Sequence, residues 1–301
     1  MAGTHLKKIL LTGTINDYNK LTNNFNNQIN KKMNKALLTV AAVALAIPAF
    51  AQDNAVAKDL LLSAKFGYAS HFVENGMQRQ KDNFNATIDV GYNLPASGDF
   101  ATDVYAELFY MSPISKTFNQ VDVTLGSKVW YAYEYFMDFG YTYSGYPNSD
   151  GRRAETTEEM NRANINHQNT IYLGVGRDVE LIDGAEWSAL VFSAYTSYAF
   201  STEDWVVKVS AEKSFQKVFV DELDLSVKAT YGYSNAGDYA GKGSNISNDY
   251  GFFEVATAAV YHLTPSVDAT IGVAYDFVNE DQYNNKARST WTVSGGLVFR
   301  Y

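Results

Sequence analysis

The sequence predicts an all-β fold: a closed antiparallel transmembrane β-barrel of twelve strands in an up-and-down meander. Three observations support this fold class. Apolar and polar residues alternate along twelve segments, most of these segments have ten to fourteen residues, and the connections between them alternate between short and long. Soluble strands average about five or six residues, whereas a tilted strand that crosses a bilayer needs about nine to eleven. The number and length of the segments therefore favour a membrane barrel over a soluble sandwich.

The alternation is clearest in the last segment, where one face carries Trp291, Val293, Gly295, Leu297, Phe299 and Tyr301. The other face is polar except for Val298. A period of two over ten or more residues is typical of a strand with one apolar and one polar face. The twelve segments are 60–73, 82–93, 100–111, 120–132, 135–146, 167–177, 187–199, 204–214, 221–234, 250–262, 266–278 and 288–301. Segment 187–199 is the weakest, because Trp187, Ala189 and Val191 compete with Leu190, Phe192 and Ala194 for its apolar face.

The connections fit a barrel whose two ends lie in the periplasm, because bacterial outer-membrane barrels alternate short periplasmic turns with longer external loops. The expected external connections are 74–81, 112–119, 147–166, 200–203, 235–249 and 279–287. The expected periplasmic turns include 93–99, 133–134 and 263–265, while 178–186 is longer than ideal. Loops 147–166 and 235–249 are rich in Asn, Asp, Gly and Ser, which suit turns and solvent.

The N-terminal part has the features of a secretory signal peptide. Met33-Asn34-Lys35 precedes an apolar run over 36–47, and Ala49-Phe50-Ala51 then forms an A-x-A site, which predicts cleavage between Ala51 and Gln52. The run is too short for a membrane-spanning helix, which needs roughly 20 residues. We interpret 1–32 as a non-native upstream extension, or alternatively as a long n-region of the same signal, 33–51 as the signal peptide, and 52–301 as the barrel domain. The mature protein is expected in the outer membrane of a Gram-negative bacterium.

Charge and cysteine content limit the partners. Residues 1–51 hold six Lys and one Asp, which leaves 18 basic and 32 acidic residues and a net charge of −14 in the mature part. This balance argues against nucleic acid as a partner. The chain has no cysteine, so no disulfide scaffold holds the exported protein. Three His residues scattered over the mature part do not suggest a transition-metal site, and no cofactor is expected.

The alternation assigns side chains to the two faces of the barrel. The charged residues expected inside, lining a lumen, are Lys65, Asp89, Asp103, Glu107, Asp122, Lys128, Asp138, Lys208, Glu212, Asp224, Lys228, Glu254, Asp268, Asp276 and Arg300. Aromatic girdles are expected at the two membrane interfaces, from Tyr92, Tyr261, Phe299 and Tyr301 on the periplasmic side and Tyr143, Trp205, Tyr233, Phe277 and Trp291 on the external side. A row of charges in a dry core would be costly, so a water-filled or charge-networked lumen is expected.

Two segments carry a resemblance to known proteins. The ending Gly295-Gly296-Leu297-Val298-Phe299-Arg300-Tyr301 resembles the terminal strand of outer-membrane β-barrel proteins, which implies the barrel-assembly machinery as a partner during biogenesis. The first hairpin, from Gly67 to Gly76, is weakly similar to a family of uncharacterised proteobacterial outer-membrane proteins. That family has Arg-Gly where this sequence has Asn75-Gly76, and the similarity implies no substrate.

Three functions are open at this point. The first is a narrow porin-like channel for passive diffusion of small hydrophilic solutes or ions, in which loop 147–166 is either a constriction or a solvated surface loop. The second is a non-conducting structural or adhesive barrel that displays its long loops. The third is a hydrolase at the rim, using His71 or His167 with Ser144 or Asp138, but no spaced nucleophile motif is present and catalysis is not expected.

Overall fold

The computed structural model describes residues 60–75, 77–114, 119–145, 167–180, 189–200, 204–235, 249–278 and 289–301. The expected extension 1–32, the signal peptide 33–51 with its cleavage site, loop 147–166 and most of 235–249 lie outside these residues. Within them, no helix is long and apolar enough to cross a membrane.

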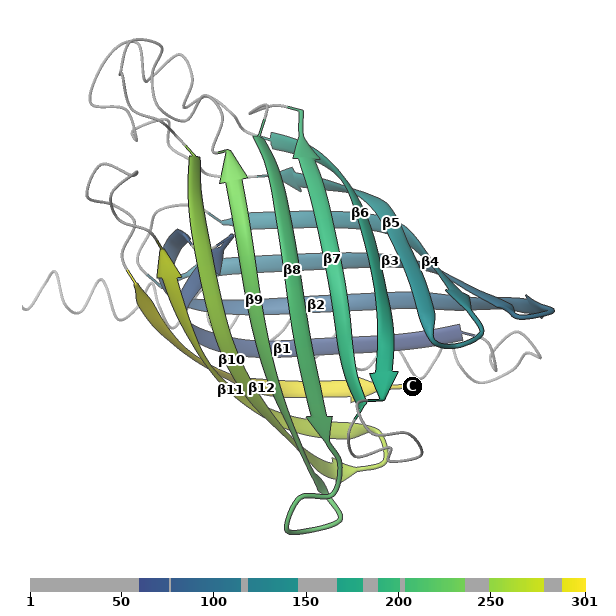
Figure 1. Cartoon of the computed structure of the whole chain (residues 1–301). Coiled ribbons are helices and arrows are strands. Elements are labelled where there is room, and N and C mark those ends of the chain that lie inside the picture. Colours follow the sequence, from purple (N-terminus) through teal and green to yellow (C-terminus); the bar gives the residue numbers. More distant parts are fainter. Residues whose placement is uncertain are drawn as a thin grey trace, which may run out of the picture. The chain divides into compact units, whose positions relative to one another are not determined.

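Twelve strands make up the described structure (Figure 1). They are β1 (Leu60–Glu74), β2 (Met77–Ser97), β3 (Phe100–Pro113), β4 (Gln120–Tyr131), β5 (Tyr135–Gly145), β6 (His167–Glu180), β7 (Ala189–Ala199), β8 (Asp204–Phe215), β9 (Leu223–Asn235), β10 (Asp249–Thr264), β11 (Val267–Val278) and β12 (Thr290–Arg300). Each strand pairs antiparallel with its sequence neighbours, so the topology is an up-and-down meander.

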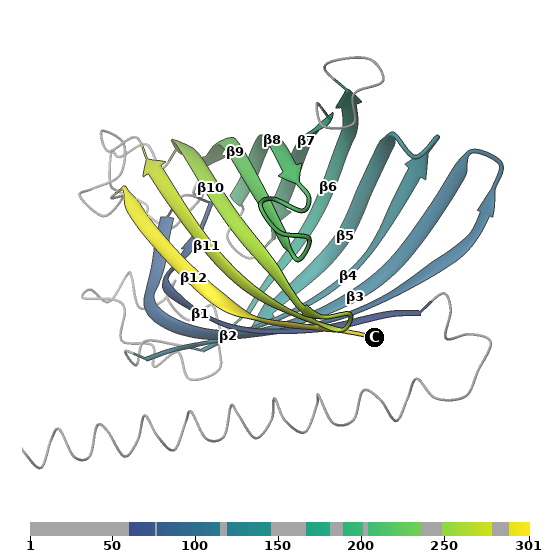
Figure 2. The ribbon, with the colours of Figure 1, turned by 90° about the horizontal axis from the view of Figure 1, so that it is seen from below.

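Pairing between the first and last strands closes the barrel. The register runs from Ser63 opposite Arg300 to Ala69 opposite Ser294. Figure 2, which is turned by 90° from Figure 1, shows β12 beside β1. Closure leaves no free sheet edge, which is the condition for a sheet to span a bilayer. The fold class predicted from the sequence is confirmed.

Two connections differ from the prediction, because β2 is longer than its apolar alternation. It starts at Met77 and runs for 21 residues, so the connection expected as external loop 74–81 is a tight turn around Asn75. At the other end, β2 continues to Ser97 and reduces the expected turn 93–99 to Gly98-Asp99. Alternation marks only the part of a strand that has one apolar face, whereas backbone pairing continues through polar residues.

The register also settles the faces of β7. Phe192 and Leu190 lie opposite Arg177 and Val179 of β6, whereas Tyr195 lies opposite Gly174. Residues directly opposite each other point to the same side of a sheet, so Leu190, Phe192 and Ala194 share one face. Phe192 is exposed on the outer surface of the barrel. The competing set that begins with Trp187 therefore does not face outward over the described part of this strand.

The outer surface is apolar and uncovered. Leu125, Ile271 and Trp291 are 57%, 58% and 63% exposed, and similar side chains recur at every second position around the barrel. Exposed apolar surface of this extent is unfavourable in water but matches the acyl chains of a bilayer.

Candidate functional site

The inner face is identified by a contact that only a curved sheet allows. The hydroxyl groups of Tyr105 on β3 and Tyr172 on β6 are hydrogen-bonded, although β4 and β5 lie between these strands. Side chains on two strands that are separated by two others can meet in this way only on the concave side of the sheet. Tyr105 lies opposite Gly126, Gly126 opposite Gly140, and Gly140 opposite Tyr172, so all four share the inner face.

The same register places each charged residue that the sequence analysis assigned to the lumen. Asp103, Lys128 and Asp138 lie opposite one another across β3, β4 and β5. Asp89 lies opposite Glu107 on the neighbouring pair of strands. The remaining members, followed strand by strand, fall on this face as well.

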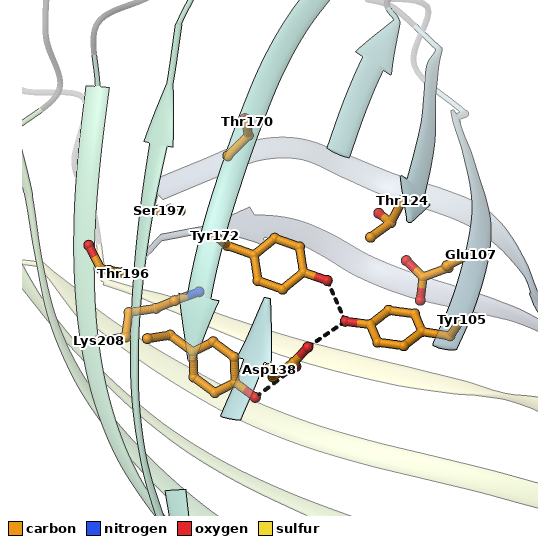
Figure 3. A pocket seen from close by; sticks show the side chains of 10 residues that line it. Tyr105, Glu107, Thr124, Asp138, Thr170, Tyr172, Thr196, Ser197 and Lys208 are labelled. Atoms are coloured by element: carbon orange, nitrogen blue, oxygen red, sulfur yellow. Dashed lines mark hydrogen bonds between the residues drawn. The ribbon is translucent and has the colours of Figure 1, made fainter. Parts of the chain in front are cut away.

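Two tyrosines converge on one carboxylate of this face, and a third tyrosine joins them through a hydrogen bond to one of the two. The hydroxyl of Tyr105 donates to Oδ1 of Asp138 at 2.7 Å, and the hydroxyl of Tyr195 donates to Oδ2 at 3.2 Å. Tyr172 is hydrogen-bonded to Tyr105 in turn. Figure 3 shows this cluster, which brings together side chains from β3, β5, β6 and β7. We call these four residues the tyrosine cluster.

Glycines lie directly beneath the tyrosine rings. A Cβ at Gly126 would lie 2.5 Å from ring atom Cζ of Tyr105, and a Cβ at Gly174 would collide with the ring of Tyr195. Each ring therefore lies along the barrel wall, over the neighbouring strand, instead of standing upright in the lumen. Glycine inside a strand is otherwise unfavourable by roughly 0.5–1 kcal/mol relative to Ala, so close approach of another group is a physical reason for its presence.

A cavity of about 360 Å³ opens beside the tyrosine cluster. Its lining comprises Tyr105, Glu107, Thr124, Asp138, Thr170, Tyr172, Tyr195, Thr196, Ser197 and Lys208. Small-molecule sites commonly occupy about 300–1,000 Å³ and combine aromatic surface with a few polar groups. Figure 3 shows Lys208 and Glu107 on opposite sides of this lining.

The other inner charges form local pairs. Lys65 contacts Asp89 at 2.9 Å, and Ser63 donates to the same carboxylate at 2.7 Å. Lys228 lies 3.9 Å from Glu212. Lys128 stands over the rings of Trp130 and Phe136, 4.3 and 4.1 Å from their centroids, in cation–π geometry.

A second polar cluster lies at the end of the barrel where β12 ends, formed by residues of β9, β10, β11 and β12. His262 contacts Asp268 through Nδ1 at 2.7 Å and Asp224 through Nε2 at 3.0 Å. Arg300 binds the other oxygen of Asp268 at 2.6 Å, and Asp268 is only 2% exposed. These contacts tie the terminal strand to the two hairpins before it.

A third inner cluster is mostly apolar. Val206, Tyr250, Phe252 and Val278 are buried together, and Asp276, directly opposite Glu254, is 1% exposed. The ring of Phe252 covers Gly232, as the tyrosine rings cover their glycines. This part of the barrel is filled by side chains.

The aromatic residues expected in the girdles lie on the outer face or at its ends. Trp205 packs against Tyr233 with ring centroids 5.4 Å apart, and Tyr143 stacks on His167 at 6.0 Å. Trp291 packs against Tyr275 at 4.7 Å. Phe277, Tyr261 and Tyr301 are exposed, whereas Tyr92 and Phe299 are half-buried. The structure adds an aromatic group that the sequence analysis did not name, formed by Phe100, Tyr131 and Tyr135 at the ends of β3, β4 and β5.

The tyrosine cluster was also missed from sequence. Aromatic residues were expected outside, yet Tyr105 stands between Asp103 and Glu107 on the charged side of its own alternation. Tyr172 and Tyr195 occupy the same phase, two residues from Gly174 and Ser193. An aromatic residue in the polar phase, opposite a glycine in the polar phase of the next strand, is the signal that could have identified it.

The chain has the fold of outer-membrane β-barrel proteins. No protein-family model and no curated protein matches the sequence. Among solved structures, an outer-membrane channel from Pseudomonas putida F1 aligns with a TM-score of 0.52 and 10% identity, over 80% of this chain and 95% of that one. The NanC porin aligns with a TM-score of 0.42 and 14% identity, over 80% of this chain and 100% of that one. The KdgM porin aligns with a TM-score of 0.42 and 9% identity, over 79% of this chain and 99% of that one. At these identities the likeness concerns the fold.

Proposed function

We propose that the protein is a narrow outer-membrane channel for passive diffusion of small hydrophilic solutes. The observation that carries the proposal is the inner face, where charged and hydroxyl side chains border a cavity instead of forming a dry apolar core. Lys65, Lys208 and Glu107 are half-buried or exposed there, which is consistent with contact with water inside the barrel. Twelve strands give a narrower tube than the 16 to 18 of general porins.

The location follows from the same surfaces. An apolar exterior with aromatic residues towards the strand ends supports insertion in the outer membrane, with its lipids as surroundings. The last strand closes with Phe299 and Arg300, and Tyr301 follows it; this aromatic pattern supports the barrel-assembly machinery as a partner during biogenesis. Export through a cleaved signal peptide belongs to the same proposal.

The rim-hydrolase alternative finds little support in the described residues. His71 contacts the adjacent Ser70 at 3.2 Å, His167 stacks on the outer face against Tyr143, and His262 is held between two carboxylates. The contacts of these three residues contain no hydroxyl–imidazole–carboxylate chain. Ser144 lies opposite Gln168, on the face away from His167.

Conductance of the refolded protein in planar lipid bilayers tests the channel. Stepwise current increases after addition of the mature barrel, residues 52–301, are the expected result. A folded, membrane-inserted barrel that gives no steps would contradict the proposal and favour the plugged, structural alternative.

A further inference from the structure

The tyrosine cluster offers hydrogen-bond acceptors to the cavity and keeps no phenolic proton for a ligand. Each phenol has one proton. Tyr105 and Tyr195 both donate theirs to Asp138. Because the proton of Tyr105 is used there, Tyr172 must donate in the hydrogen bond between the two tyrosines. What remains towards the cavity is phenolic and carboxylate lone pairs.

The charged side chains of the lining also favour a ligand that donates hydrogen bonds. The lining holds two acidic side chains, Asp138 and Glu107, and one basic side chain, Lys208, which has an interaction partner of its own. Asp89, directly opposite Glu107 on the next strand, is paired with Lys65 at 2.9 Å and adds no net charge. A ligand that carries N–H donors and positive charge therefore gains more here than an anion.

The ring faces add a third contribution. The glycines beneath them let the rings of Tyr105, Tyr172 and Tyr195 lie close to the wall, and all three tyrosines also line the cavity. A cation over the face of a tyrosine ring is attracted by the quadrupole of the ring, and more strongly where water is partly excluded. The three tyrosines are half-buried, so water is partly excluded from their rings.

We propose that this cavity is a binding subsite for small organic cations with N–H donors, of the ammonium or guanidinium type, along the diffusion path. Asp138 and Glu107 are the anionic groups, and the three tyrosines supply lone pairs and ring faces. The inference rests on the proposed channel function for its role in permeation, but binding itself does not depend on conductance. The volume of about 360 Å³ accommodates a ligand of roughly ten non-hydrogen atoms.

The test compares three probes of similar size, the dication agmatine, the neutral sugar xylose and the dianion adipate. Isothermal titration with the detergent-folded barrel measures binding, and blockage of ion current in planar bilayers measures it in the open channel. We expect agmatine to bind and to interrupt the current, and adipate to do neither. Binding of xylose as tight as that of agmatine would overturn the proposal in favour of a polyol site.

Variants assign the binding to the cavity. Asp138→Asn removes the charge at nearly constant shape and should weaken agmatine binding about tenfold or more. Glu107→Gln, which leaves the tyrosine hydrogen bonds in place, should weaken it less. Glu254→Gln, a charge loss on the inner face of β10 away from the cavity lining, is the matched control and should leave the affinity unchanged.

The outcomes separate the two proposals. A conducting barrel that does not bind agmatine, or binds it equally well after Glu107→Gln and Asp138→Asn, contradicts the subsite and leaves the channel standing. A non-conducting barrel that binds agmatine through these carboxylates contradicts the channel and supports the subsite. Retention of the folded electrophoretic mobility in unheated samples shows that each variant is folded, and Glu107→Gln decides if Asp138→Asn does not fold.

Discussion

The substitution Gly140→Ala tests whether the tyrosine cluster depends on the glycines beneath it. A Cβ at Gly140 would lie 2.5 Å from the backbone oxygen of Leu125 and 2.6 Å from Cζ of Tyr172. The backbone atom cannot move without disturbing the β4–β5 ladder, so the ring or the strand must shift. Overpacking costs about 1–3 kcal/mol. Loss of the hydrogen bond between Tyr172 and Tyr105 adds about 1 kcal/mol.

Part of this cost is offset, because replacing glycine in a strand returns about 0.5–1 kcal/mol. We therefore expect the free energy of unfolding to fall by about 1–3 kcal/mol, the range of overpacking. The matched control is Gly91→Ala, also on the inner face, where the nearest atom is Cβ of Leu61 at an ordinary 3.5 Å. This control should be neutral or slightly stabilising.

Urea unfolding of the barrel in lipid vesicles, followed by tryptophan fluorescence, measures both variants. Equal stability of Gly140→Ala and Gly91→Ala would refute the reasoning, since it would mean that the tyrosine rings do not lie where the structure places them.

Three further predictions concern the membrane, export and charge. Val273→Arg, on the outer face at the middle of β11, should lower the free energy of unfolding in vesicles by about 2–4 kcal/mol, while Thr270→Arg on the inner face should cost little; equal tolerance would contradict the assignment of faces. N-terminal sequencing of the protein from outer-membrane fractions should begin at Gln52, and retention of residues 33–51 would contradict cleavage. The channel should be weakly cation-selective in dilute KCl gradients, where screening is weak, and the combined change Glu107→Gln and Asp138→Asn should move the reversal potential towards zero. A reversal potential that favours chloride in the unmodified protein would contradict this prediction. It would mean that the excess of acidic residues on the inner face does not set the ion preference.

The fold was predictable because a lipid-facing strand has to alternate. Most of the twelve strands repeat an apolar residue at every second position over their membrane part, and this signal needs no knowledge of partners. It fails where the two faces of a strand are not different, as at 78–81 of β2, where four polar residues follow one another. It was ambiguous in β7 because Val191 and Phe192 both suit the outer face, and the pairing with β6 decided between them.

The candidate site was only partly predictable. The carboxylates Glu107 and Asp138 follow from alternation, but their relation to each other depends on the register of four strands and on the curvature of the wall. Tyr105 and Tyr172 are 67 positions apart in sequence and meet only because two intervening glycines let their side chains cross β4 and β5. In the same way, His262 and Asp224 are 38 positions apart and come together through pairing of β9 with β10.

The proposed channel requires that the polar face of the barrel is wet and borders the conduction path, while the apolar face meets lipid. The chain has no cysteine, so single cysteines can be placed without background. Neighbouring positions of β4 offer the sharpest contrast, with Thr124 inside and Val123 outside. Thr124→Cys should react with a charged, membrane-impermeant thiol reagent, and the reaction should lower the single-channel conductance. Val123→Cys in the same bilayer should not react, and reaction at Val123 with none at Thr124 would contradict this assignment of the two faces.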